Sequence, residues 1–344
     1  MKPFRTAAVA TALFLGSISA SLAQISGDVV KLGVLDDMSG PYADIQGPGD
    51  VVAVKMAVED FGGTVNGKPI EVVSADLQNK ADVGAAIARR WYDVENVDAI
   101  LGLGNSAVAI AVQGIATEKN RVAITTAAGS TALTGKMCSP VGIHWVYDTY
   151  ALAKGTASAI VKRGGGSTWF FITADYAFGH SLEQDTAAIV KQNGGQVVGS
   201  VRAPLNSSDF SSFLLQAQSS KAEVIGLANA GADTINSIKN ASDFGIVAGG
   251  QKLAGLLVLI TDIHTIGLRD AQGLLFTEAY YWDQNDETRA FAKRFAARHG
   301  GKPPTMFQAG IYSAAMHYLK AVAAAGTDEA KTVVAQMKKM PVND

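Results

Sequence analysis

The sequence of 344 residues contains a single cysteine, Cys138. No disulfide bond can therefore form within this chain as given, and a large apolar core has to hold the fold. The composition agrees with such a core, because 48% of the residues are hydrophobic and only 17% are charged. In an exported protein, an odd cysteine indicates a free thiol or a partner that is missing.

Long hydrophobic runs are also scarce. The longest run begins near the N-terminus, where Lys2 and Arg5 precede an apolar stretch from about Ala7 to Ile18. Small residues then lead to Ala23, which is typical of a secretory signal peptide with its cleavage site. The stretch is shorter than the roughly 20 residues of a membrane-spanning helix. We therefore predict a signal peptide at 1–23 in preference to a membrane anchor, and no membrane insertion of the mature protein.

Neither sign of charge dominates. Without Lys2 and Arg5, 27 basic and 31 acidic residues remain, which gives a net charge of −4. No block of basic residues is present, so neither a nucleic acid nor an anionic membrane surface is an expected partner.

Enzymatic and metal-binding motifs are missing as well. The chain has no G-x-S-x-G elbow and no phosphate-binding G-x-x-x-x-G-K-[ST] sequence. Its histidines are scattered, and no second cysteine could complete a zinc site. Asp36 and Asp37 are adjacent on a predicted strand and should point to opposite faces, which disfavours a catalytic pair. We expect no cofactor, no metal and no enzymatic activity.

Short apolar runs alternate with longer amphipathic segments along the rest of the chain. This alternation predicts an α/β fold with mostly parallel sheets flanked by helices. About 320 mature residues favour two Rossmann-like lobes over one. The predicted strands are 29–36, 68–76, 97–103, 121–126, 167–175, 196–204, 222–229, 252–261 and 273–283. The predicted helices are 48–63, 81–95, 106–120, 150–165, 180–195, 208–220, 232–245, 286–299, 305–325 and 328–339.

Five predicted strands end in polar, glycine-rich sequences. Ligands of open parallel sheets bind outside the carboxyl ends of the strands. With two lobes, these ends can face each other across a cleft. The five sequences are DDMSGPY, GLGNS, TTAAGST, TADYAFG and LANAGAD.

The sequence GLGNS, at 102–106, is the most informative of the five. A dinucleotide site is disfavoured, because the turn follows the third strand and the next strand ends in Thr125 and Thr126, not in an acidic residue. Ser106 stands at a predicted helix N-terminus, where free N–H groups attract anions. The turn at 127–130 offers a second set of backbone donors. Together they could clamp a carboxylate, although Ser106 could instead only cap its helix.

Several of these segments, in this order and spacing, resemble one known family. The segments VVKLGVLDDMSGPYADIQGPG, VNGKPIEVVSAD, GLGNSAVAIAVQ, ITTAAGSTALTG and TADYAFG are similar to those of the type I periplasmic binding proteins of branched-chain amino-acid ABC transporters. The resemblance covers nearly all of the mature chain. It implies two lobes joined by a three-stranded hinge, with 24–147 plus 279–344 in the N-terminal lobe and 148–278 in the C-terminal lobe. It also implies a periplasmic monomer that delivers a small organic acid to an inner-membrane ABC permease.

The resemblance also implies the ligand-binding residues. Ser106, beside Asn105, stands at the family's carboxylate-binding serine, and Tyr42 stands at the aromatic residue beside the ligand. The second carboxylate loop corresponds to Ala128, Gly129 and Ser130. The second lobe would contribute Asp148, Tyr150, Asp175, Tyr176, Phe178 and Asn229.

Two departures from the family pattern stand out. Amino-acid-binding members place a glutamate after the strand at 252–261 to hold the ligand's ammonium group, whereas this chain has Asp262 and His264 there. Candidate cleft residues are rich in aromatics, which favours the subgroup that binds aromatic carboxylates such as hydroxybenzoates or hydroxycinnamates. An amino acid held by Asp262 or Asp175, or a ligand-sensing domain of a receptor, remains the alternative.

The second departure is at the C-terminus. The chain stops about where a third crossing strand should start, so a missing tail carrying the partner of Cys138 is expected.

Overall fold

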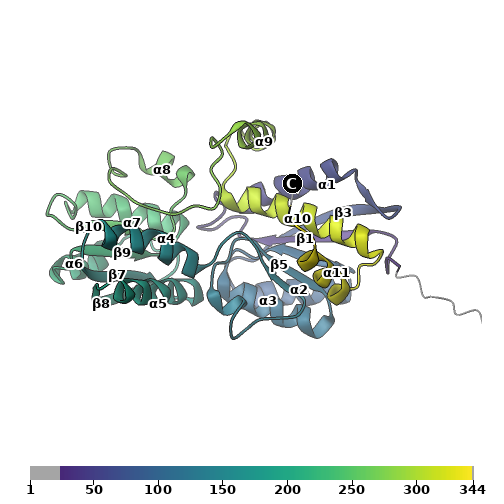
Figure 1. The fold of residues 1–344 in the computed structure, drawn as a ribbon, viewed down its shortest axis with the longest axis horizontal. Helices are drawn as coiled ribbons and strands as arrows, with labels where there is room; N and C mark the ends of the chain where they lie inside the picture. Colours follow the sequence, from purple (N-terminus) through teal and green to yellow (C-terminus); the bar gives the residue numbers. More distant parts are fainter. Residues whose placement is uncertain (1–23, 343–344) are drawn as a thin grey trace, which may run out of the picture.

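The computed structural model describes residues 24–342 and contains two sheets, each in its own lobe (Figure 1). The predicted signal peptide lies outside the described residues. None of the helices among these residues has the length and apolar character needed to cross a membrane.

The first lobe is built on a six-stranded sheet with the order β2-β3-β1-β4-β5-β6. All neighbouring strands are parallel except the short pair β2–β3. Helices α1 and α10 pack together on one face of the sheet, while α2 and α3 cover the other face (Figure 1). The strands are β1 (Val30–Asp36), β2 (Thr64–Val65), β3 (Lys68–Asp76), β4 (Ala99–Gly102), β5 (Val122–Thr125) and β6 (Gly142–His144). The helices are α1 (Gly47–Phe61), α2 (Ala81–Asp93), α3 (Ser106–Lys119), α9 (Asp286–Ala296), α10 (Met306–Ala325) and α11 (Ala330–Lys339).

The second lobe has a four-stranded, wholly parallel sheet with the order β10-β9-β7-β8. Helix α4 packs against α5, and α6 packs against α7. The strands are β7 (Thr168–Ala174), β8 (Gln196–Ala203), β9 (Val224–Ala228) and β10 (Lys252–Gly255). The helices are α4 (Thr149–Lys162), α5 (Ala177–Gln192), α6 (Ser211–Ser219), α7 (Gly231–Asp243) and α8 (Ile260–Ile266).

The central strands are buried on both faces because helices cover both sides of each sheet. All four residues of β4 and all five of β9 are buried. Such strands are continuous apolar runs without alternation, as parallel sheets require. The fit is close where α2 crosses β1, because a side chain at Gly33 would collide with the ring of Trp91. The α/β prediction is therefore confirmed, whereas the lobe boundaries stay a prediction.

Two of the predicted strands are wrong. The segment 252–261 is a strand only at Lys252–Gly255, because Asp262 accepts a hydrogen bond from Leu259 N (2.9 Å) and α8 begins at Ile260. The segment 273–283 contains no strand. Its apolar side chains, such as Leu274 and Tyr280, pack against the apolar clusters of the second lobe without joining a sheet. The prediction also missed β2, β6, α8 and a short 3₁₀ helix, Thr131–Leu133.

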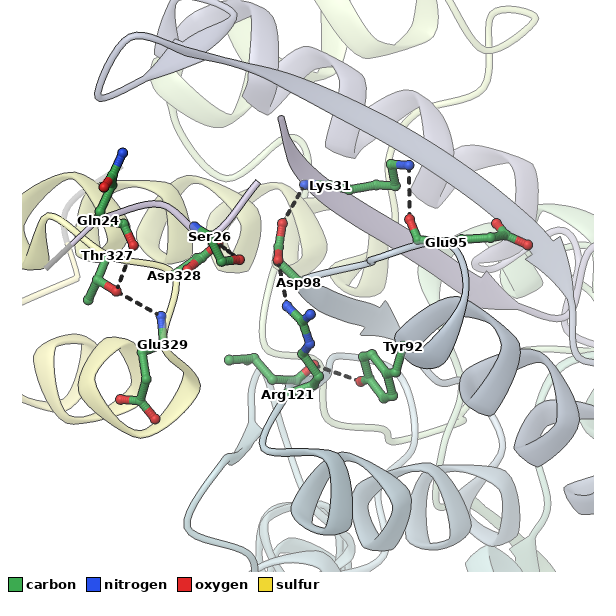
Figure 2. A network of polar contacts seen from close by, with 11 residues as sticks. Gln24, Ser26, Lys31, Tyr92, Glu95, Asp98, Arg121, Thr327, Asp328 and Glu329 are labelled. Carbon is green, nitrogen blue, oxygen red and sulfur yellow. Dashed lines mark hydrogen bonds and ion pairs between the residues drawn. The ribbon is translucent and has the colours of Figure 1, made fainter. Parts of the chain in front are cut away.

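A polar network closes the first lobe at the end opposite its carboxyl strand ends (Figure 2). Asp98 is buried, accepts a hydrogen bond from Lys31 N (2.8 Å) and pairs with Arg121 (2.8 Å). Nearby, Asp328 accepts hydrogen bonds from Ser26, which ties the first described residues to the loop before α11. Asp98 therefore joins the starts of β1, β4 and β5.

We predict that Asp98→Ala lowers the free energy of unfolding by about 2–3 kcal/mol, because the Lys31 N–H and the Arg121 guanidinium lose a buried acceptor. Chemical denaturation monitored by circular dichroism measures this change. Asp98→Asn keeps an acceptor for Lys31 N and should lose less. Equal losses in the two variants would contradict this role of the acceptor.

Candidate functional site

Each sheet has one topological switch point, where the connections from two neighbouring strands leave in opposite directions. In the first lobe, β1 lies between β3 and β4, so the connections from β1 and β4 leave in opposite directions. In the second lobe, β7 lies between β8 and β9 in the same way. Ligands of open α/β sheets bind at such points.

A small cavity lies where the two switch points meet. Its volume open to the centre of a water molecule is about 10 Å³, enough for about one water. Its lining comes mainly from the loops that follow β1, β4, β5, β7, β9 and β10. The lining residues are Tyr42, Ile45, Gln46, Gly104, Ala127, Tyr147, Tyr176, Phe178, Ala230, Leu257 and Phe307.

The lining combines five aromatic rings with no charged side chain. Tyr42 Oη of the first lobe and Tyr176 Oη of the second lie 2.6 Å apart and form a hydrogen bond across the cavity. Burial raises the pKa of Tyr42, Tyr147 and Tyr176, so all three hydroxyls remain protonated, and that of Tyr147 donates to Ala127 O (2.7 Å). The cavity can therefore surround a flat apolar body and offer neutral hydrogen bonds to its polar ends.

Further contacts join the lobes beside the cavity. Ala232 N donates to Pro41 O (3.2 Å), and a side chain at Gly231 would collide with that same carbonyl. Thr131 Oγ1 and Ser181 Oγ lie 3.1 Å apart. The lobes are thus closed on each other around the cavity.

The turn GLGNS connects β4 to α3. Gly102 and Leu103 have φ angles of 97° and 60°, so the chain reverses sharply before Gly104 reaches the cavity. Asn105, not Ser106, caps α3, because its Oδ1 accepts from Ala107 N (3.0 Å) and Val108 N (3.3 Å). The alternative that Ser106 is only the helix cap is therefore wrong. Ser106 is the first helical residue and is fully buried.

The second turn lies directly beside the first. Ser130 N donates to Ser106 Oγ (3.3 Å), and Ser130 Oγ itself accepts from Ala132 N (3.3 Å). Ala128 O accepts from the ring nitrogen of His144 (2.8 Å). A side chain at Gly129 would lie 2.7 Å from the ring of Tyr147, so this position needs glycine. The structure thus brings Asn105, Ser106 and the 128–130 turn together, next to the lining residues Gly104 and Ala127.

Several predicted residues of the second lobe have other contacts. Asp148 caps α4 by accepting from Ala151 N (2.7 Å). Tyr150 is 46% exposed and has Lys154 Nζ over its ring at 5.6 Å. Asp175 is exposed and lies 2.9 Å from His180 Nε2. These three residues do not line the cavity, whereas Tyr176 and Phe178 do.

The remaining polar candidates are held by internal bonds. Asn229 is buried, donates to Ser237 Oγ (2.8 Å) and accepts from Thr234 Oγ1 (2.7 Å). Burial raises the pKa of Asp262 to about 7, and its carboxyl group accepts Leu259 N. His264 is exposed on α8. None of the three lines the cavity.

Sequence reasoning missed part of the lining. Phe307 begins α10, and its ring lies 5.5 Å from that of Tyr147. No local motif marks Phe307, because only the return of the chain to the first lobe brings it to the cleft. Asp233, which lies near the cavity but does not line it, was also missed. It lies near enough to raise the pKa of Tyr42 and Tyr176, and burial raises its own pKa to about 6.

Comparison with known proteins gives the family. A family model described as periplasmic binding protein matches residues 29–344. The chain belongs to the periplasmic binding protein family. Proteins of this family bind small solutes for ABC transporters and are not enzymes, which agrees with the architecture described above.

Three solved structures extend this comparison. A periplasmic binding protein from Burkholderia mallei is 55% identical, with a TM-score of 0.90, over 92% of this chain and 84% of that chain. A branched chain amino acid ABC transporter periplasmic ligand-binding protein from Burkholderia xenovorans LB400 is 43% identical, with a TM-score of 0.79 and the same coverage. An R. palustris ABC transporter solute binding protein, in complex with 4-hydroxybenzoate, is 26% identical, with a TM-score of 0.81, over 90% of this chain and 84% of that chain.

The cap at the start of α3 can be tested separately from ligand binding. We predict that Asn105→Ala lowers the free energy of unfolding by about 1 kcal/mol, because the N–H groups of Ala107 and Val108 lose their acceptor. Asn105→Asp keeps the acceptor and should lose less. Urea denaturation of the two variants measures the difference, and an Asn105→Ala protein as stable as the parent would contradict the capping role.

Proposed function

We propose that this protein is the periplasmic binding component of an ABC importer and that it carries a small aromatic carboxylate, such as a hydroxybenzoate or hydroxycinnamate, in the cavity between its lobes. The observation that carries the proposal is the lining, with five aromatic rings and no charged group. Aromatic side chains pack favourably on a flat ring. An ammonium group, in contrast, is costly to bury without a carboxylate partner.

In this proposal the two adjacent turns hold the ligand's carboxylate. Ser106 Oγ and the backbone of Ala128–Ser130 lie at the start of α3, where the helix dipole favours negative charge. Tyr42 and Tyr176 stay protonated and supply a neutral donor, whereas the hydroxyl of Tyr147 already donates to Ala127 O (2.7 Å). Tyr42 or Tyr176 would bond a ring hydroxyl at the opposite end of the ligand.

Closure around the ligand provides the signal for transport. Only about 10 Å³ of the cavity is open to the centre of a water molecule, so the lobes have to separate, and the hydrogen bond between Tyr42 and Tyr176 has to open, to make room for an aromatic acid. A ligand that contacts both lobes favours the closed state by its differential affinity for that state. An inner-membrane permease would then recognise the closed, loaded protein.

A branched-chain or other amino acid is the second candidate, favoured by the description of the B. xenovorans neighbour. Asp233 is the carboxyl group best placed for an ammonium ion, because it lies near Tyr42 and Tyr176 and its Oδ1 has no hydrogen-bond partner. Its Oδ2 already accepts Asn206 N (3.0 Å).

A thermal-shift screen of the protein distinguishes the candidates. The panel contains benzoate, 4-hydroxybenzoate, hydroxycinnamates, leucine, valine and glutamate. A ligand at 100 times its Kd adds about 2.7 kcal/mol, which raises Tm by several degrees for a protein of this size. We expect a shift with an aromatic acid and none with leucine. A shift with leucine or valine alone would reject the aromatic proposal.

The serine of the first turn is expected to matter for the carboxylate. Ser106→Ala should weaken aromatic-acid binding by about 1–3 kcal/mol, because a hydrogen bond to a charged group is lost. Isothermal titration calorimetry measures this change. Ser139→Ala is the control. It removes a hydroxyl that makes an exposed hydrogen bond with Thr117 Oγ1, away from the cavity, and should leave the affinity unchanged. An unchanged affinity in Ser106→Ala would remove this residue from the site.

Asparagine variants test the acidic candidates. We expect Asp262→Asn to leave the affinity for any aromatic acid unchanged, because Asp262 does not line the cavity. Asp233→Asn should abolish binding of an amino acid, if one binds, and should alter aromatic-acid affinity less than tenfold, which is about 1.4 kcal/mol. The same calorimetric titration separates these outcomes.

A further inference from the structure

A pair of acidic residues lies directly behind the cavity. Asp36 is the last residue of β1, and Asp50 lies in the first turn of α1. Both side chains are fully buried, with 0% exposure. Acidic side chains are almost never buried to this extent without a partner, so the pair needs a physical explanation.

The contacts of Asp36 connect it to the glycine-rich turn. Asp36 Oδ1 accepts a hydrogen bond from Gly104 N (2.9 Å), and Gly104 lines the cavity. A side chain at Gly102 would collide with the Asp36 carboxyl group. On its other side, the Asp36 carboxyl lies within hydrogen-bond reach of that of Asp50.

Within residues 24–342, no basic side chain acts on Asp36 or Asp50. The charged groups that act on Asp36 are Asp50 from α1 and Asp37, which directly follows β1. Both are acidic, and the β4–α3 turn contributes only the N–H of Gly104. Asp36 Oδ2 and both oxygens of Asp50 receive no N–H or O–H from any other group in the described part of the chain. The described residues also contain no cluster of three or more potential metal ligands.

We propose that Asp36 is a positioning residue that keeps its proton at neutral pH, donates its O–H to Asp50, and through its other oxygen holds Gly104 in place at the wall of the binding cavity. Two buried carboxylates in contact cannot both be charged without a large energetic penalty. A proton between them removes the repulsion and supplies the missing donor. The proton is thus part of the structure of the ligand-binding turn.

The pair has a defined effect on pH dependence. Burial raises the pKa of Asp50 to about 7, and burial together with the neighbouring Asp50 raises the pKa of Asp36 well above the value of about 3.9 in the unfolded chain. The folded state then binds more protons than the unfolded state, so the contribution of the pair is complete below about pH 4 and declines as pH rises through 7. Loss of the Asp36 proton brings two negative charges together and displaces the turn.

Asp36→Asn tests the proposal because asparagine reproduces the protonated side chain. Its oxygen accepts Gly104 N–H, and its amide donates to Asp50 without needing a proton. We expect the unliganded variant to melt within a degree or two of the parent at pH 6 and several degrees above it at pH 9. Asp50→Asn should also melt above the parent at pH 9, since its amide donates to Asp36. Asp36→Ala, which leaves Gly104 N–H without an acceptor, should melt below the parent at both pH values.

A second measurement follows binding and rests on the proposed function. The probe is benzoate, which has no ring hydroxyl to titrate. We expect the Kd of benzoate for the parent to rise about tenfold from pH 6 to pH 9. This change corresponds to the loss of about one hydrogen bond to the charged carboxylate of the ligand. For Asp36→Asn, the Kd should change little over the same range. Asp262→Asn is the control, because it removes a buried carboxyl with a raised pKa from the second lobe. It should alter the pH dependence of Tm but not that of Kd.

Two results would overturn the proposal. The first is an Asp36→Asn protein that is less stable than the parent by the same amount from pH 6 to pH 9, which would mean that Asp36 is ionised throughout. The second is an effect of cations. If Na⁺, Mg²⁺ or Ca²⁺ raises the Tm of the parent at constant ionic strength but leaves the Tm of Asp36→Asn unchanged, a cation bridges the pair. Failure of benzoate to bind at any pH would count against the proposed function only, because the melting measurements need no ligand.

Discussion

Parallel strand pairing is the constraint on which the rest of this molecule depends. Because helices cover both faces of each sheet, the central strands β4 and β9 are buried and apolar throughout. Polar and conformationally unusual residues therefore collect in the loops at the carboxyl ends. The two lobes place these loops opposite each other, so that the cavity lies between two switch points.

The glycine-rich turn after β4 shows how closely the backbone is packed at this place. Gly102 has to be glycine because its φ is positive and the Asp36 carboxyl occupies the space of a side chain. The turn places Gly104 at the cavity, Asn105 at the N-cap of α3 and Ser106 against the neighbouring turn. Three successive residues therefore have three different tasks, and a change at one of them need not affect the others.

The acidic residues near the cleft explain why it is neutral. Asp148 caps α4, Asp262 bonds to the backbone before α8, and Asp36 lies behind the first turn. None of these carboxyl groups lines the cavity, which leaves aromatic rings, apolar side chains and one amide around a ligand. The selectivity of the site then rests on ring packing and on hydrogen bonds to neutral groups, where an unpaired buried group is costly.

The sequence by itself determined the alternation of strands and helices, the family and the loops that carry the site, because apolar periodicity and glycine-rich turns are local signals. Its resemblance to the family also indicated Tyr42, Tyr176 and Phe178, which line the cavity. The sequence did not determine the path of 273–283, whose apolar residues fill gaps in the lobe cores and join no sheet. Only the tertiary structure decided that Phe307 reaches the cleft, that Tyr150 points to solvent, and that Asp36 meets Asp50. Each of these depends on how helices pack onto strands far away in the chain, and no residue pattern within a single segment contains that information.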